Sequence, residues 1–140
     1  MTEEKITYFF EHLSKSTSLS AFSDIYDDQV EFKDPFNEVK SIKSVHGVFA
    51  HMYRNLDNPR FVIREYIAKD NIAYVKWEFS FSFKNESIQN AFEGVSRLKM
   101  NKEGKVIQHT DYWDSAEHMY EKMPFIGWLI HKIKQMIVRS

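Results

Sequence analysis

The segment NIAYVKWEFSFSF, residues 71–83, has the clearest secondary-structure pattern in the chain. From residue 75 onward, large apolar side chains alternate with polar or charged ones. Because successive side chains of a strand point to opposite faces of a sheet, this alternation predicts a strand with one buried face. The buried face would carry Val75, Trp77, Phe79, Phe81 and Phe83, and the opposite face Lys76, Glu78, Ser80 and Ser82. The sequence therefore predicts a sheet with one strongly apolar side.

Further strands are predicted before and after this segment, because runs of β-favouring residues alternate with short polar turns. The predicted strands are residues 61–68, 71–83, a segment ending near 100, and 105–113, joined by turns at 69–70, 84–87 and 101–104. Each turn is short enough for a hairpin. We therefore predict one curved antiparallel meander.

Three segments before residue 60 and one after 114 have apolar residues at intervals of three and four, which is the spacing of an amphipathic helix. The predicted helices are 2–14, a short helix capped by Ser18, 41–56 ended by Asn58 and Pro59, and two pieces within 115–140. Between the second and third helices, residues 29–34 alternate as a short strand that Pro35 closes. This order predicts an α+β fold with helices on one face of a bent sheet.

Composition indicates one globular domain, residues 1–140, in which 115–140 is a C-terminal helical extension. The chain has 140 residues, 43% hydrophobic and 28% charged, with a formal net charge of -1. This balance provides no long-range attraction for nucleic acid, and the lack of cysteine excludes disulfides and thiolate chemistry. The start of the chain has no long apolar run, and the apolar stretch 125–130 is too short to span a bilayer. We expect a cytoplasmic protein with no nucleic-acid or membrane partner.

Three local strings, in this order of elements, resemble the nuclear transport factor 2-like (NTF2-like) superfamily. They are YDDQVEFKDP at residues 26–35, the hairpin from Gly94 to Val106, and DYWD at residues 111–114. The superfamily includes ketosteroid isomerases, limonene epoxide hydrolases and SnoaL-type polyketide cyclases. The resemblance implies a cone-shaped fold, in which a strongly curved mixed or antiparallel sheet wraps around the N-terminal helices and a deep apolar pocket.

The resemblance also suggests which polar residues face the pocket. Asp34 matches the general base of ketosteroid isomerases, but Phe10 and Ser96 stand where those enzymes have their oxyanion-binding tyrosine and aspartic acid. Asp111 matches a catalytic carboxylate of the epoxide hydrolases, but Val75 and Trp77 stand where their arginine and second aspartate belong. Neither of these two activities is therefore expected.

SnoaL-type cyclases use an aspartate on the last strand as acid and base, often beside a histidine. Asp111 with His109 fits that pattern best, and the resemblance places Ile107, His109, Asp111 and Trp113 on the inner face of this strand. The expected catalytic residues are Asp111, Asp34 and His109. The expected ligand-binding residues are Phe10, Phe32, Phe36, Tyr53, Trp77, Phe79, Ser96 and Trp113.

Each polar residue also has a simpler structural interpretation. Asp34 precedes a proline, so its carboxylate could bind local backbone amides in a turn. Asp111 and His109 could form a structural pair. Neither the histidine spacing nor this pair provides a metal site, and we expect no metal and no cofactor.

Two functions therefore stay open from the sequence. The first is cofactor-independent acid–base catalysis, of cyclase, isomerase or hydrolase type, on a small hydrophobic, carbonyl-bearing molecule. The second is a non-catalytic module that binds a ligand or another protein. We expect a homodimer through the outer face of the sheet. Segment 115–140 would close the pocket or contribute to the dimer.

Overall fold

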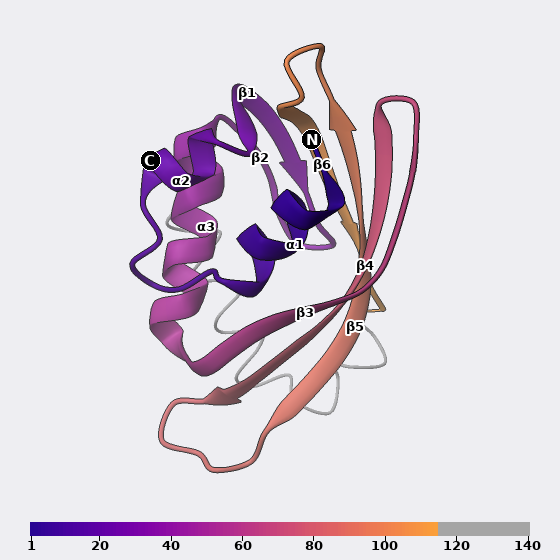
Figure 1. Ribbon diagram of the computed structural model, residues 1–140. Coiled ribbons are helices and arrows are strands. Elements are labelled where there is room, and N and C mark those ends of the chain that lie inside the picture. Colours follow the sequence, from indigo (N-terminus) through magenta and orange to yellow (C-terminus); the bar gives the residue numbers. More distant parts are fainter. Residues whose placement is uncertain (115–140) are drawn as a thin grey trace.

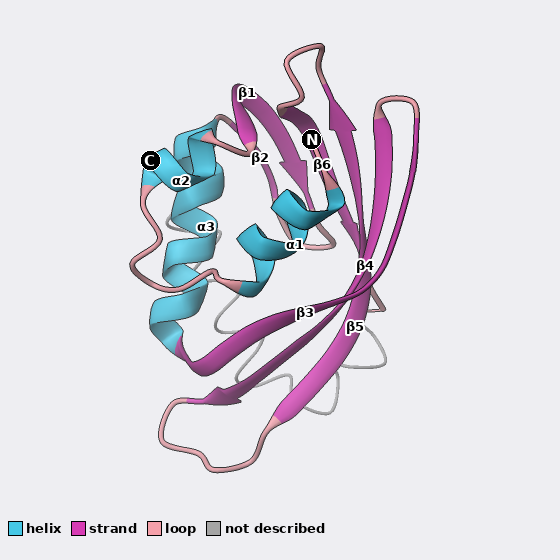
Figure 2. Cartoon of the chain, in the orientation of Figure 1, coloured by secondary structure: helices cyan, strands magenta, loops and turns pink. Residues whose placement is uncertain are grey.

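The computed structural model describes residues 1–114, and the expected helical extension at 115–140 lies outside the described residues. The described elements, in chain order, are α1 (Glu3–Glu11), α2 (Leu19–Ser23), β1 (Tyr26–Lys33), β2 (Glu38–Lys40), α3 (Ile42–Asn55), β3 (Leu56–Lys69), β4 (Ile72–Phe83), β5 (Asn90–Met100) and β6 (Val106–Tyr112). The expected α+β fold is confirmed (Figures 1 and 2). Among residues 1–114, no helix is long and apolar enough to cross a membrane.

The strands form one six-stranded sheet in the order β2-β1-β6-β5-β4-β3. The sheet is strongly curved, α1 lies within the curve, and α3 runs along the open side (Figure 1). Strands β3 to β6 form the predicted antiparallel meander. However, β1 pairs with β6 in parallel, and Phe32 lies opposite His109. The sheet is therefore mixed, which is one of the two arrangements that the resemblance implied. The pairing of β1 with β6 itself was not predicted, because pairing between strands so far apart in sequence has no local signal.

The helices begin where side-chain caps are available. The Thr2 hydroxyl accepts a hydrogen bond from the Lys5 amide, and Ser18 accepts one from the Ala21 amide, so both α1 and α2 are capped. The apolar face of α1 buries Ile6, Phe9 and Phe10 against the inner face of the sheet. These contacts hold α1 against the inner face of the sheet.

The end of α3 differs from the prediction. We expected Asn58 and Pro59 to terminate the helix and to precede a strand at 61–68. Instead α3 ends at Asn55, and β3 begins at once and includes both residues at a shift in register. Asn58 has a φ of 50°, and β3 is an edge strand, where a proline without an N–H group is tolerated. The three-residue strand β2 was not predicted at all.

On β4, the inner face of the sheet carries the apolar residues that the sequence pattern predicts. Val75, Trp77, Phe79, Phe81 and Phe83 are all buried. On β6, however, the alternation is interrupted: Lys99 pairs with Gln108, but Met100 pairs with Val106. This bulge places Val106 in the core and leaves Ile107 half-buried, so the prediction that Ile107 belongs to the inner set was wrong.

Candidate active site

Two neighbouring strands bring the central polar residues together on the concave face of the sheet. On β6, His109 and Asp111 are separated by one residue and therefore point to the same side. On β5, Ser96 lies directly opposite Asp111, and Leu98 lies opposite His109. On β4, Trp77 reaches across Gly94, its partner in the sheet, toward Ser96. The register of three antiparallel strands thus fixes this part of the site.

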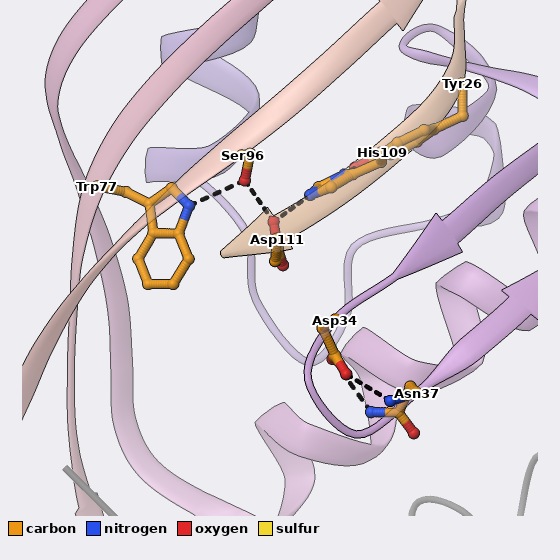
Figure 3. A network of polar contacts seen from close by, with 7 residues as sticks. All are labelled: Tyr26, Asp34, Asn37, Trp77, Ser96, His109 and Asp111. Carbon is orange, nitrogen blue, oxygen red and sulfur yellow. Dashed lines mark hydrogen bonds and ion pairs between the residues drawn. The ribbon is translucent and has the colours of Figure 1, made fainter. Parts of the chain in front are cut away.

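These residues form one continuous chain of hydrogen bonds (Figure 3). The distances are 2.9 Å from Tyr26 Oη to His109 Nδ1, 2.6 Å from His109 Nε2 to Asp111 Oδ1, 2.5 Å from Ser96 Oγ to the same oxygen, and 2.9 Å from Trp77 Nε1 to Ser96 Oγ. The His109 side chain is 1% exposed and that of Asp111 is 14% exposed. Asp111 is therefore the most exposed residue of this hydrogen-bonded series.

The direction of these hydrogen bonds follows from the indole of Trp77, which can only donate. Because Ser96 Oγ accepts from Trp77, its own proton goes to Asp111 Oδ1. Asp111 Oδ1 is then an acceptor, so the short contact with His109 places a proton on Nε2. Asp111 Oδ2 has no hydrogen-bond partner among residues 1–114. A proton that Asp111 gains would therefore reside on Oδ2.

Asp34 lies just after β1 in the turn that leads to β2, and its carboxylate binds that turn. Asp34 Oδ1 accepts hydrogen bonds from the backbone amides of Phe36 and Asn37, and Oδ2 accepts one from the Asn37 side chain. In Figure 3 the carboxylate points toward Asn37 and not toward Asp111. The local-turn interpretation of Asp34 is therefore confirmed.

A hollow of about 550 Å³ brings the two carboxylates to one surface. Its lining consists of Lys33, Asp34, Pro35, Thr110, Asp111, Tyr112, Trp113 and Asp114. Burial raises the pKa of Asp34, its hydrogen bonds from Asn37 and Phe36 oppose that rise, and the charge of Asp111 adds to it. The two carboxylates thus repel each other across the hollow, although only Asp111 has an oxygen without a local partner.

The raised pKa of Asp34 predicts a pH dependence of stability. Its folded-state pKa lies above its unfolded value of about 3.9, so the folded chain binds this proton more tightly. The contribution of Asp34 to stability is therefore present at low pH and decreases as pH rises through the folded pKa. Asp34→Asn keeps an oxygen for the two backbone amides and does not titrate. The free energy of unfolding of this variant, relative to that of wild type, should therefore increase from pH 4 to pH 7. Urea denaturation at these pH values measures the difference, and a constant difference would contradict the prediction.

The residues expected to bind a ligand fall into two groups. Phe10, Phe32, Tyr53, Trp77, Phe79 and Ser96 are buried, and all except Ser96 belong to the hydrophobic core. Phe36 and Trp113 are half-buried, and their rings lie 5.4 Å apart. Of the eight residues, only Trp113 is also in the lining of the hollow. Of the expected ligand-binding residues, it is thus the one best placed to contact a molecule beside Asp111.

Tyr53 is a buried tyrosine on α3. It is 3% exposed, and its hydroxyl has no partner in the described part of the chain. Because an unsatisfied buried hydroxyl costs free energy, Tyr53→Phe should raise the free energy of unfolding by about 1 kcal/mol. Tyr26→Phe removes a bonded hydroxyl and should lower it by about the same amount. Parallel chemical denaturation of both variants tests the contrast, and a loss of stability in Tyr53→Phe would refute it.

Two residues of the site were missed by sequence reasoning. Tyr26 was noted only as the first residue of the string at residues 26–35, yet its hydroxyl contacts His109. Asn37 holds Asp34 and is itself buried, with its Oδ1 unpartnered among residues 1–114. An asparagine three residues after the aspartate of an Asp-Pro pair was a usable signal for the turn. In the same range, no group of three or more His, Asp or Glu side chains could hold a metal ion.

The family follows from a match over most of this fold. The model of the SnoaL-like domain matches residues 6–109. The chain belongs to the SnoaL-like domain family. The expected NTF2-like superfamily is thereby confirmed, and the match begins within α1 and ends at His109 within β6. No curated protein matches this SnoaL-like domain.

Solved structures share the fold of this SnoaL-like domain at low sequence identity. A hypothetical protein with a ketosteroid isomerase-like fold from Catenulispora acidiphila, in complex with trimethylamine, has a TM-score of 0.71 at 12% identity and covers 85% of this chain and 92% of its own. An NTF2-like protein of unknown function from Exiguobacterium sp. 255-15 has a TM-score of 0.67 at 14% identity, over 83% and 100%. A candidate SnoaL-like polyketide cyclase from Jannaschia sp. CCS1 has a TM-score of 0.68 at 10% identity, over 79% and 83%. At these identities the similarity shows the fold alone.

Proposed function

We propose that this SnoaL-like domain is a cofactor-independent acid–base catalyst that acts on a small carbonyl-bearing molecule. Asp111 would be the base, His109 and Ser96 would hold it in place, and the substrate would occupy the hollow beside Trp113. The family membership and the similarity to a candidate polyketide cyclase support a reaction of this class.

The observation that carries the proposal is the unequal use of the two oxygens of Asp111. Oδ1 accepts hydrogen bonds from Ser96 and His109, whereas Oδ2 has no partner within residues 1–114 and Asp111 lines the hollow. A carboxylate held by one oxygen, with the other available, is oriented for proton transfer. Asp111 would take a proton from the carbon next to the substrate carbonyl onto Oδ2 and return it to a second atom of the substrate.

The surrounding residues restrict the substrate further. Phe10 has no hydroxyl, and the Ser96 hydroxyl donates to Asp111, so neither residue can donate a hydrogen bond to a developing oxyanion. The site would therefore suit a carbon acid whose anion is already stabilised by a second carbonyl, such as a 1,3-dicarbonyl compound. A simple ketone would be a poor substrate.

Hydrogen–deuterium exchange tests the proposal directly. The protein is incubated in D₂O with a 2-substituted 1,3-diketone or with a cyclic monoketone, and exchange is followed by NMR against the rate in buffer. We expect exchange above the buffer rate for the diketone and little for the monoketone. Native mass spectrometry of the purified protein would identify any bound compound and extend the panel. No exchange above buffer with any bound compound would overturn the proposal.

A non-catalytic binding module is the second candidate, and one observation favours it. Both oxygens of Asp34 are engaged by its own turn, so of the two expected catalytic aspartates only Asp111 is oriented for chemistry. Under this alternative, native mass spectrometry would show a bound ligand, the exchange assay would show no activity, and substitution of Asp111 would change affinity alone.

Self-association through the outer face of the sheet belongs to the same proposal. Tyr74 and Ile67 pair across β4 and β3, and Tyr112 lies on the outer face of β6; they are 46%, 65% and 57% exposed. These side chains alternate with the buried stripe, so they all face away from the helices. A dimer in native mass spectrometry that Tyr74→Glu converts to monomer would support this interface.

A further inference from the structure

Tyr26 is a buried residue that contacts His109 on the side of Nδ1. It is the first residue of β1, it is 1% exposed, and its backbone pairs in parallel with Val106 of β6. Its ring lies nearly parallel to that of His109, with centroids 5.9 Å apart and planes at 15°, and its centroid is also 5.9 Å from that of Phe22. The hydroxyl lies 2.9 Å from His109 Nδ1. Tyr26 therefore contacts His109 through its hydroxyl, and the planes of the two rings are nearly parallel.

The hydroxyl of Tyr26 acts as a donor in this contact. Nε2 of His109 carries the proton that faces Asp111, and Nδ1 is the one acceptor that the Tyr26 hydroxyl proton has among residues 1–114, so Nδ1 accepts. Burial, with a smaller effect from the charge of Asp111, raises the pKa of Tyr26 well above its usual value, so the hydroxyl keeps its proton. Within residues 1–114, Tyr26 Oη has no other hydrogen-bond partner.

The other tautomer of His109, with the proton on Nδ1, is disfavoured by the contact between Nε2 and Asp111. If Nδ1 carried the proton, a bare Nε2 would face Asp111 Oδ1 at 2.6 Å, and that oxygen already accepts from Ser96. Two lone pairs would then meet in a buried place, which is costly. One arrangement alone satisfies all the donors: Tyr26 donates to His109, and His109 donates to Asp111.

We propose that Tyr26 is a positioning residue, which holds the Nε2–H tautomer of His109 against Asp111 Oδ1 and so leaves Oδ2 as the single oxygen able to accept a proton. Its effect on turnover rests on the proposed function, whereas its effect on His109 does not. Tyr26 does not line the hollow and acts only through the imidazole.

The test is Tyr26→Phe, which keeps the ring and removes the hydroxyl. The Nε2–H proton of His109, identified by its loss in His109→Gln, is followed by ¹H–¹⁵N NMR. Without the donor, Nδ1 is buried and unsatisfied, so local opening of the His109–Asp111 contact becomes easier. We expect the Nε2–H proton to exchange with water about tenfold faster and kcat to decrease about tenfold, with KM little changed.

Tyr53→Phe is the matched control for the NMR measurement, because it removes an equally buried hydroxyl that has no partner within residues 1–114. It should leave the His109 resonance and its exchange rate unchanged. Equal exchange in Tyr26→Phe and wild type would overturn the proposal, as would faster exchange with unchanged kcat. If the wild-type protein shows no turnover, the proposed function fails, and the exchange rate of Nε2–H still decides whether Tyr26 holds His109.

Discussion

Asp111→Asn is expected to reduce turnover of the diketone probe by about 10²–10⁴-fold, which is the usual contribution of a general base. The asparagine amide oxygen can accept the hydrogen bonds from Ser96 and His109 that Oδ1 accepts now. The amide nitrogen then replaces Oδ2, and it cannot take a proton. The substitution therefore removes the chemistry of the side chain and leaves its shape and its two donors in place.

The stability of the variant separates a catalytic role from a structural one. Because both donors keep an acceptor, the free energy of unfolding of Asp111→Asn should stay within about 1 kcal/mol of wild type. Asp28→Asn provides the control, since Asp28 is an exposed aspartate on β1 and is not among the residues that line the hollow. Turnover by Asp111→Asn at the wild-type rate would remove Asp111 from the mechanism, and a large loss of stability would indicate a structural pair with His109.

Local patterns in the sequence were sufficient for the parts of the fold that neighbouring residues determine. The alternation in β4 indicated its buried face, and the turn residues at 101–104 indicated the hairpin between β5 and β6. The parallel pairing of β1 with β6 was not predicted, because it joins segments separated by most of the chain. The strand that includes Asn58 and Pro59 was missed for another reason: proline is unfavourable in a strand only when its missing N–H is needed, and β3 is an edge strand.

In the candidate site, too, some residues were predictable from the sequence and others were not. Alternation placed His109 and Asp111 on one face of the strand, and the resemblance to the NTF2-like superfamily implied that this face and Ser96 point inward. In the structure Asp111 contacts both His109 and Ser96. The role of Trp77 as a donor to Ser96 depends on the cross-strand pairing with Gly94, which no composition rule indicates. Tyr26 reaches His109 only because β1 and β6 are parallel neighbours. His109, Asp111 and Ser96 were thus predictable as members of the site, and the contacts of Trp77 and Tyr26 with them were not.

Gly94→Ala is expected to destabilise the fold by about 1–3 kcal/mol, which is the usual cost of overpacking. A Cβ at this position would lie 2.4 Å from Cη2 and 2.5 Å from Cζ2 of Trp77, so the indole would have to move. Trp77 is 5% exposed and donates to Ser96, and a displaced indole would lose that hydrogen bond as well. In an unobstructed strand the same change would be stabilising by about 0.5–1 kcal/mol, so the sign of the effect identifies the contact. Urea denaturation followed by circular dichroism measures it.

The same substitution in a Trp77→Phe background separates this contact from a general backbone effect at residue 94. The clashing atoms belong to the outer part of the indole, which phenylalanine lacks. Adding Gly94→Ala to Trp77→Phe should therefore cost little or be stabilising, and the two substitutions should be non-additive, as expected for residues in contact. An equal loss in both backgrounds would show that the backbone of Gly94, and not the indole, requires glycine. If the coupling is found, glycine at this position is what allows Trp77 to reach Ser96, and through Ser96 to hold Asp111 Oδ1.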